Sequence, residues 1–284
     1  MLIEPHQSSG ALLRDIAAAS EAHDTFHVWW FGQSGFLLKW TDHHLLFDPY
    51  LSDSLTKKYA DTDKPHVRMT ARCIDPAELP AIGTVTSTHN HTDHLDAETL
   101  LPLVATNPEL RLVLPEANRA FAMERLAGNL PAMTTLNDGD LLDVGPWTFH
   151  GVASAHVGGT HEVARDAMGC CEHLGFVVEF GDFAVYHTGD TMWHPHLVPS
   201  LIDFQLDLVF VPINGFKAER RVSGNLNGTE AATLAKAVGA GMAIPHHYDM
   251  FEFNTETTDE FAAVCRRLDQ PFSILRCGER WTHS

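Results

Sequence analysis

Several short apolar runs of this sequence end in histidine or aspartate, and this recurrence constrains the fold more than any other feature. One run leads into residues 88–96, THNHTDHLD, a stretch with three histidines and two aspartates. Others end at His156, at Asp190 and at the pair His246 and His247. A surface or capping role would explain any one of these residues alone. Together they favour a fold in which strand ends meet around a cation.

The spacing within residues 88–94 is that of a metal-binding loop. His89, His91 and Asp93 lie two residues apart, so along an extended backbone their side chains face one side. Where the chain turns into the next element, His94 can reach a second point beside the first. A solvated polar loop would explain the polarity of this stretch but not its spacing. Because these side chains cannot close two metal sites alone, other strand ends must supply further ligands.

The apolar pattern predicts strands and helices in a mixed order. A short amphipathic helix at 11–19 precedes a meander of strands at 27–30, 35–40 and 44–48. Residues 51–76 show no apolar periodicity, which indicates either an active-site loop or a solvated connection. Further strands are expected at 82–85, 111–114, 141–144, 147–153, 175–180, 183–187, 207–212, 242–245 and 273–276, and helices at 97–106, 116–127, 229–238 and 258–268. This mixture predicts an α+β protein of two packed sheets with helices outside, in a single domain over residues 1–284.

The charge balance disfavours one class of partner. Thirty-seven acidic against nineteen basic residues give a formal charge of -18, which repels long nucleic acids. The five cysteines form no even framework and suit a reducing compartment. The amino terminus lacks the order of a secretory signal, and no run approaches the roughly 18 apolar residues of a membrane span. We therefore predict a cytoplasmic protein with no membrane segment.

The few basic residues gather in two segments. Five of the nineteen lie between residues 57 and 72, and Lys217, Arg220 and Arg221 form a second group. Ammonium and guanidinium groups bind carboxylate and phosphate well, so these segments suit a small anionic substrate. A solvated face, or a contact between copies in a homo-oligomer, explains the pattern equally well. The substrate-binding residues that we predict are Arg68, Lys217, Arg220 and Arg221.

The loop at 88–94 also carries a resemblance to a known family. His89, His91, Asp93 and His94 match in full the HxHxDH signature of the metallo-β-lactamase superfamily. Within it, the segments WWFGQSGFLLKW, LLFDPYLSD, VYHTGDTMWH and AIPHHYDMF are similar to the ascorbate-6-phosphate lactonase-like branch, over about residues 27–251. The loop at 157–172 and the histidine at 156 depart from the sugar-lactonase member. The resemblance implies an αββα sandwich with one or two divalent metal ions.

The same resemblance assigns the metal ligands. The segment IPHHYD resembles the Pro-x-His-Tyr pattern of the family, which favours His247 over His246 as the last ligand. His150 and His161 are alternatives for the position given to His156. The resemblance then places one ion on His89, His91 and His156 and the other on Asp93, His94 and His247, with Asp190 bridging the two.

The chemistry expected of such a site is hydrolysis. A divalent cation lowers the pKa of bound water from 15.7 to about 7, which supplies hydroxide, and a second cation about 3.5 to 4 Å away can polarise a carbonyl or phosphoryl oxygen. Mixed imidazole and carboxylate ligands fit zinc, and manganese and iron tolerate similar sets. We expect zinc or manganese.

Further groups are assigned to catalysis and support. Asp93 and Asp190 would hold the ions, and His246 or Tyr248 would hydrogen-bond the leaving group. Tyr248 has a second explanation, as a core residue with its hydroxyl satisfied. Metal-binding side chains commonly need outer hydrogen-bond partners, and the candidates here are Asp48, Asp96 and His187.

These observations predict a metal-dependent hydrolase of a small ester or lactone, and the basic segments predict that this substrate is anionic. A phosphodiesterase acting on a small or cyclic nucleotide is the alternative enzyme, because two-metal sites catalyse that reaction too. A non-catalytic metal-binding protein is the alternative from another class. Hydrolysis of β-lactams is disfavoured, since nothing in the sequence suggests the secretory route.

Overall fold

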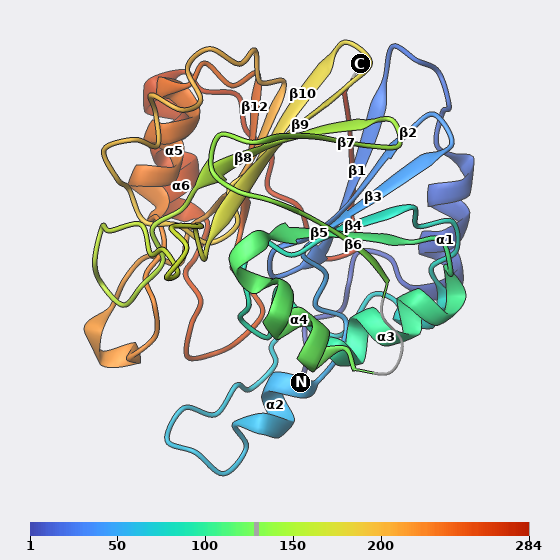
Figure 1. The fold of residues 1–284 in the computed structure, drawn as a ribbon, viewed down its shortest axis with the longest axis horizontal. Helices are drawn as coiled ribbons and strands as arrows, with labels where there is room; N and C mark the ends of the chain where they lie inside the picture. The colour runs from blue at the N-terminus through green and yellow to red at the C-terminus, as the bar shows by residue number, and fades with distance from the viewer. Residues whose placement is uncertain (128–130, 284) are drawn as a thin grey trace.

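Two mixed β-sheets packed face to face form the middle of the molecule, with helices on both outer sides (Figure 1). The computed structural model describes residues 1–127 and 131–283. One hydrophobic cluster fills the space between the sheets and reaches the helices behind the second sheet, and another lies behind the first sheet. This arrangement confirms the predicted αββα sandwich.

The first sheet has the order β13-β1-β2-β3-β4-β5-β6. Its first three strands in sequence form the predicted antiparallel meander, and parallel pairing follows from β3 to β6. Side chains alternate along β1, so that Val28 and Trp30 enter the core between the sheets while Trp29 and Phe31 face the outer helices. The strands are β1 (Phe26–Gly32), β2 (Gly35–Trp40), β3 (His43–Phe47), β4 (Thr84–Thr86), β5 (Arg111–Pro115), β6 (Ala132–Leu136) and β13 (Arg280–His283).

The second sheet has the order β12-β11-β10-β9-β8-β7. The strands β10, β11 and β12 run parallel, and the remaining pairs are antiparallel. All residues of β11 are buried, as expected for a strand covered on both faces. The strands are β7 (Leu141–Val144), β8 (Trp147–Ala153), β9 (Leu174–Phe180), β10 (Phe183–His187), β11 (Leu208–Pro212) and β12 (Met242–His246).

The helices cover the sheets according to their apolar faces. α1 (Ser9–Ala18), α3 (Ala97–Thr106) and α4 (Arg119–Arg125) pack behind the first sheet, whereas α5 (Gly228–Ala237) and α6 (Asp259–Leu268) pack behind the second (Figure 1). Asn227 and Glu230 form a reciprocal capping box that fixes the start of α5. None of the helices within the described ranges has the length and apolarity needed to cross a lipid bilayer.

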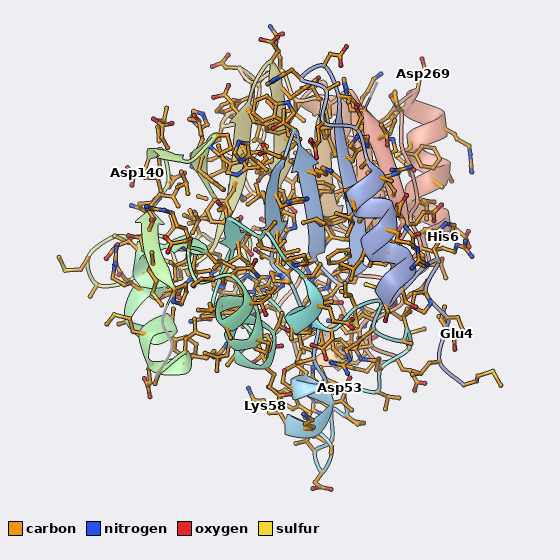
Figure 2. The ribbon with its side chains drawn as sticks, turned by 90° about the vertical axis from the view of Figure 1, so that its right-hand side faces the viewer. Glu4, His6, Asp53, Lys58, Asp140 and Asp269 are labelled. Atoms are coloured by element: carbon orange, nitrogen blue, oxygen red, sulfur yellow. The ribbon has the colours of Figure 1, made fainter. Side chains whose placement is uncertain are left out.

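The segment at 51–76 is mostly irregular, as predicted, but it contains the short helix α2 (Ser54–Lys58). Figure 2 shows α2, with Asp53 and Lys58, projecting from one edge of the sandwich. Tyr50 and Leu55 anchor this projection by packing against Met250 and Phe251. The loop is therefore attached to the segment that follows β12.

The sequence placed one strand wrongly and missed two others. Residues 273–276 form no strand, because the Leu275 carbonyl accepts the Tyr248 hydroxyl and the chain then turns at Gly278 to add β13 beside β1. The strand β6 was not predicted, since its sequence AMTTL is short and partly polar. Residues 273–276 run beside β12 of the second sheet, where the Ser273 N–H donates to the Ala243 carbonyl. The strand β13 was not predicted either, and β6 and β13 are the two edge strands of the first sheet.

One edge of the sandwich collects the ends of strands from both sheets. The loop at 88–94 follows β4 of the first sheet, while His156, Asp190 and His247 follow β8, β10 and β12 of the second. Because parallel strands end at the same edge, these segments meet although they lie far apart in the sequence. The fold thus provides the convergence that the sequence pattern requires.

Candidate metal centre

The first group of ligand atoms comes from both sheets. His89, His91 and His156 each offer a nitrogen, and these atoms lie within 4.8 Å of one another. His89 Nε2 is 2.9 Å from His91 Nδ1. The Nδ1–H of His156 donates to the Gly224 carbonyl at 2.8 Å, which turns Nε2 toward Asp190. These imidazoles form the first of the two groups that the sequence suggested.

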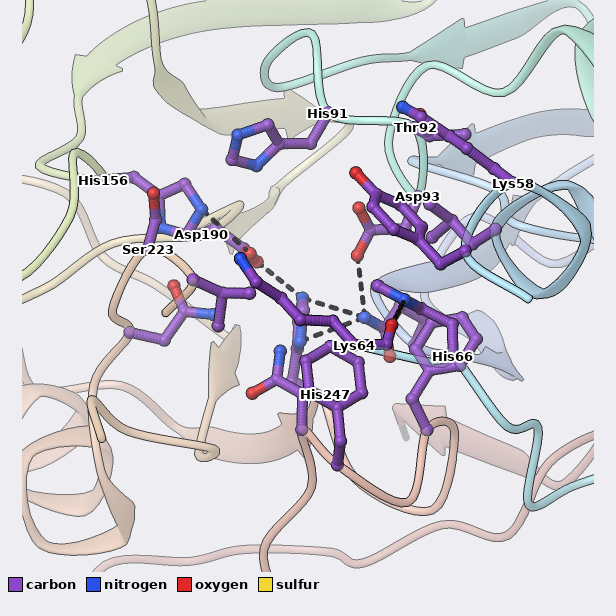
Figure 3. A pocket seen from close by; sticks show the side chains of 18 of the residues that line it. Lys58, Lys64, His66, His91, Thr92, Asp93, His156, Asp190, Ser223 and His247 are labelled. Carbon is purple, nitrogen blue, oxygen red and sulfur yellow. Dashed lines mark hydrogen bonds and ion pairs between the residues drawn. The ribbon is translucent and has the colours of Figure 1, made fainter. Parts of the chain in front are cut away.

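A second group lies beside the first. Asp93, His94 and His247 again place ligand atoms within 4.8 Å of one another. Asp190 stands between the groups: its Oδ1 is 2.7 Å from His247 Nε2 and 3.4 Å from His94 Nε2, and its Oδ2 is 3.5 Å from His156 Nε2. Figure 3 shows Asp190 between His156 and His247, with His91 and Asp93 beyond it. This is the bridging position expected for Asp190.

The donor set fits divalent cations. Within the described residues, His94 Nε2 is buried without a hydrogen-bond partner and faces Asp190 Oδ1, an oxygen that His247 Nε2 also approaches. Burial and the neighbouring imidazoles hold the pKa of His89 well below its ordinary value, and burial lowers the pKa of His156 to about 4. Neutral imidazole is the form that binds a metal ion. Nitrogen and oxygen lone pairs that converge on one point are suited to binding a cation.

The charge of Asp190 is stabilised by its surroundings. Burial alone would raise its pKa, but the imidazoles of His247 and His94 outweigh that effect and hold the pKa well below its ordinary value. For His94, burial lowers the pKa, yet the carboxylates of Asp190 and Asp93 raise it well above the ordinary value. The cluster therefore contains ionised carboxylates next to an imidazole that takes up positive charge. A metal ion would replace that proton.

Asp48 orients one ligand from behind. It is fully buried after β3, and His94 Nδ1–H donates to its Oδ2 at 2.7 Å. Thr86 Oγ1 donates to the same carboxylate at 2.6 Å, and so does the backbone N–H of Thr88. With Nδ1 held in this way, Nε2 of His94 points into the cluster. Of the three expected outer partners, Asp48 is the one whose carboxylate contacts a candidate ligand directly.

The other two expected partners lie further from the ligands. Asp96 accepts a hydrogen bond from Thr99 at the start of α3. His187 is bound to the Ser34 carbonyl through Nε2 and accepts the N–H of Gly189 at Nδ1. It therefore shapes the turn before Asp190 without touching the carboxylate.

Gly189 brings the two sheets into contact at this turn. Its φ is +57°, and a Cβ at this position would lie 2.6 Å from Thr88 Cβ. A side chain here would push apart the loop after β4 and the turn after β10. Glycine is required because these two loops, one from each sheet, pack directly against each other.

Gln33 is a functional candidate that the sequence reasoning missed. Its Nε2 donates to Asp93 Oδ2 at 2.8 Å and lies 3.1 Å from His247 Nδ1. The residue has a positive φ in the turn between β1 and β2, and its side chain is buried. A polar residue flanked by Gly32 and Gly35 between two apolar runs was the available signal. Gln33 connects ligands from the two sheets.

His173 is a second residue that was missed. Its ring centroid lies 5.1 Å from that of His89 and 5.5 Å from that of His156. Burial, with the neighbouring imidazoles, lowers its pKa to about 3. The available signal in the sequence was that His173 directly precedes an apolar run. This run is β9, which is antiparallel to β10 and therefore starts at the edge of the sheet where β10 ends.

The predicted leaving-group residues do not reach the cavity, which corrects that assignment. Tyr248 stacks on Trp30 with centroids 4.3 Å apart and donates its hydroxyl to the Leu275 carbonyl. Its core explanation is the one that the structure supports. His246 lies behind His247, stacked on His187 and 3.2 Å from Ser34 Oγ. Neither side chain lines the cavity above the cluster.

The alternatives for His156 lie elsewhere. His150 Nε2 is 2.6 Å from Glu179 on the neighbouring strand. His161 Nδ1 donates to the Trp193 carbonyl at 2.7 Å and lines a separate cavity. Only the histidine at 156 among these three belongs to a group of converging ligand atoms in the described residues.

A cavity of about 470 Å³ opens above the cluster (Figure 3). Ligand side chains form its floor, and aromatic rings and four cationic side chains form its walls. The aromatic side chains are Tyr59, His66, Phe121, Phe251 and Phe253, and the cations are Lys58, Lys64, Arg125 and Arg221. Polar groups that line it include Asn90, Thr92, Ser223, Asn225 and Asn254.

Three of the four predicted substrate-binding cations are absent from this lining, which corrects the sequence prediction. Arg68 Nε is held by Asp53 at 2.7 Å, and Lys217 and Arg220 share the carboxylate of Glu256. Arg221 is the exception, since it lines the cavity and also pairs with Asp63. Folding brings a carboxylate next to each of the other three cations and neutralises it. The linear sequence does not reveal such pairs.

Comparison with known proteins gives consistent results. Residues 27–247 match the model of the family described as β-lactamase superfamily domain. A UPF0173 metal-dependent hydrolase of Salinibacter ruber is 30% identical over 88% of this chain and 96% of its own length. One from Rubrobacter xylanophilus is 28% identical over 83% of this chain and 87% of its own length.

Solved structures agree at the level of the fold. An isothiocyanate hydrolase from Delia radicum gut bacteria matches with a TM-score of 0.71 and 19% identity, covering 91% of this chain and 99% of that one. A possible metal-dependent hydrolase from Veillonella parvula matches with a TM-score of 0.71 and 16% identity, covering 92% and 99%. At these identities the matches establish a shared architecture.

Proposed function

The chain belongs to the metallo-β-lactamase superfamily, in the UPF0173 family of metal-dependent hydrolases, and from this premise we propose that it hydrolyses a small ester or lactone. The observation that carries the proposal is the convergence of ligand atoms from both sheets on the floor of an accessible cavity. The narrower likeness to the ascorbate-6-phosphate lactonase-like branch stays a prediction, as does the cytoplasmic location.

Two positions for divalent cations follow from the cluster. His89, His91 and His156 would hold one ion, Asp93, His94 and His247 the other, and Asp190 would contact both. When bound there, divalent cations lower the pKa of coordinated water to about 7 and polarise the oxygen of the bond under attack. Zinc or manganese remains the expected metal.

The residues of the chain orient these ligands and the substrate. Asp48 fixes the ring of His94, and Gln33 holds the Asp93 carboxylate in place. Because Tyr248 is turned into the core, contact with the leaving group falls to a polar side chain of the cavity. Ser223 Oγ accepts the Gly158 N–H at 3.3 Å, so its own O–H can donate to a leaving oxygen.

A hydrolysis screen on protein of known metal content tests this function. The panel comprises aryl esters, lactones, phosphodiesters, cyclic nucleotides, phosphorylated sugars and, because of the similarly folded isothiocyanate hydrolase, isothiocyanates. We expect turnover of esters or lactones that a chelator abolishes and that zinc or manganese restores. Turnover of phosphodiesters alone would establish the alternative enzyme instead. Stoichiometric metal with no turnover across the panel would favour a metal-binding protein.

A further inference from the structure

We propose that Lys64, assisted by Lys58 and Arg125, determines the specificity of the cavity for a substrate that carries one anionic group on a flat apolar body. This inference rests on the proposed hydrolase function, because it names the class of ester or lactone. It concerns the mouth of the cavity, where the cations and aromatic rings lie, and not the metal ligands at the floor.

The cations around the mouth differ in their partners. Four that lie outside the cavity pair with carboxylates: Lys57 lies 2.7 Å from Glu98, and Arg68, Lys217 and Arg220 are paired as described above. Inside the cavity, by contrast, Lys64 and Arg125 hydrogen-bond only to backbone carbonyls among the residues that the structure describes. Lys64 and Arg125 thus make no ion pair among the described residues, whereas Arg221, which also lines the cavity, pairs with Asp63.

Lys64, Arg125 and Lys58 each have a neutral partner. Lys64 Nζ donates to the Arg221 carbonyl at 2.7 Å, and Arg125 Nη1 donates to the carbonyls of Asn90 and Leu95 at 2.8 and 3.0 Å. Lys58 Nζ lies 5.1 Å from the centre of the Tyr59 ring. A hydrogen bond to a full negative charge is roughly twice as strong as one to a neutral acceptor. An anion in the cavity would therefore displace the carbonyl from Lys64.

Lys64 is placed to make that exchange. Its side chain crosses the cavity from the 51–76 loop to the segment that carries Ser223, as Figure 3 shows. A long flexible stem with a mobile ammonium can turn from the Arg221 carbonyl to a substrate group without a backbone change. Asp93 and Asp190 are the carboxylates that line the cavity, and their charge is stabilised by imidazoles at the floor. Neither forms an ion pair with Lys64 in the part of the chain that the structure describes, and Lys64 Nζ bonds the Arg221 carbonyl instead.

The aromatic wall supplies the apolar half of the specificity. His66 stacks on Tyr59 with centroids 4.3 Å apart and meets Phe253 and Phe251 edge-on at 4.5 and 5.1 Å. Phe251 is buried in the cluster that anchors α2, so this wall has a rigid base. A flat apolar ring can lie against such a wall while its anionic group reaches Lys64.

The test compares two aryl acetates that differ by one carboxylate group on the ring. Para-acetoxybenzoate carries a carboxylate on the ring of phenyl acetate, and the ratio of their kcat/KM values measures anion preference. We expect the Lys64→Met substitution, which keeps the apolar stem, to lower this ratio about tenfold through KM for the charged ester. Lys58→Met should lower it less, and Lys64→Arg should retain most of it.

Lys57→Met is the matched control, because Lys57 is the helical neighbour of Lys58 but pairs with Glu98 outside the cavity. Its ratio should equal that of the unmodified protein. The inference is overturned if the unmodified protein shows no preference for the charged ester, or if Lys64→Met changes both esters by the same factor.

A binding measurement separates this inference from the proposed function. Calorimetry on metal-loaded protein compares para-hydroxybenzoate with phenol and needs no turnover. Tighter binding of the carboxylate that weakens about tenfold in Lys64→Met supports the inference even if no ester is hydrolysed. Equal binding of the carboxylate by both proteins places it on the metal ions alone and refutes the role of Lys64, whatever the hydrolase assay shows.

Discussion

At the floor of the cavity the charged side chains are mostly buried and held by residues at strand ends, whereas at the mouth they stand on loops and at helix ends and are partly exposed. His94 and Asp48 are wholly buried, and each has several fixed partners. Arg221 and Asp63, which pair at the mouth, keep more than half of their side-chain surface in solvent. Under the proposed function, reactivity would therefore come from the sandwich, and selectivity from the loops and helix ends around its mouth.

The largest effect should come from the floor. Replacing Asp190 by Ala removes the carboxylate that faces His94, His156 and His247. We expect metal retention and turnover both to be lost, by more than the roughly 10- to 100-fold that a change in a supporting residue costs. Elemental analysis and the ester assay measure this. The exposed Asp203→Ala is the control, and retained activity in Asp190→Ala would remove the basis for the comparison.

A supporting residue at the floor should have an intermediate effect. In Asp48→Asn, the amide no longer offers a carboxylate to His94 Nδ1, so the ring loses its fixed tautomer. We expect metal affinity to fall about 10- to 100-fold, with little change in KM. Titration of the apoprotein with zinc gives the affinity. A change in KM alone would show that floor and mouth are coupled.

Arg220 belongs structurally to the mouth but should behave as a stability residue. Its guanidinium donates to the carbonyls of Asn214 and Thr255 at 2.7 and 2.9 Å and pairs with Glu256. Arg220→Ala removes this donor from both carbonyls, while Glu256 keeps Lys217, and should lower the free energy of unfolding by about 1 to 3 kcal/mol. Denaturant titration measures the loss, with the exposed Arg267→Ala as control. A selective rise in KM at unchanged stability would restore the sequence-based role.

The smallest effect should be a pH response confined to the mouth. Burial lowers the pKa of His66, and nearby Lys58 and Lys64 lower it further, while Asp93 and the Lys64 carbonyl oppose the shift. The folded loop favours neutral His66. The contribution of His66 to the stability of the loop is therefore fully present above about pH 6.5 and is lost as the pH falls through the lowered pKa.

Hydrogen exchange of the amides around His66 at pH 7 and pH 5 measures this response. We expect faster opening of the loop at pH 5, after correction for intrinsic exchange rates, with no comparable change in β10. His66→Phe keeps the stacking on Tyr59 but removes the titrating group, so its loop should open equally at both pH values. The same acceleration in the variant would assign the effect to another group.

The floor could be predicted from the sequence because ligand spacing is a local property of the chain. His89, His91 and Asp93 alternate along an extended segment, and His156, Asp190 and His247 each follow a recognisable apolar run. The mouth could not be predicted, because whether a cation is available depends on a partner far away in sequence. Glu256 neutralises Arg220, and nothing near Arg220 in the chain announces that pair.

Orientation was the other property hidden from the sequence. The position of Tyr248 next to His247 suggested a catalytic role. In the structure its ring instead lies in the core, where it stacks on Trp30 and its hydroxyl donates to the Leu275 carbonyl. Gln33 shows the reverse case. It is a turn residue with no role evident from the sequence, but its backbone has a positive φ and its side chain donates to Asp93. Both outcomes depend on tertiary packing rather than on spacing.

The two sheets touch at Gly189, and the ligand cluster beside this contact can also hold the sheets together. Each candidate cation position takes donors from both sheets, so an ion held there would act as a cross-link that a chelator can cut. Supply of the metal would then govern how long the folded chain withstands heat or a protease, in addition to how fast it works.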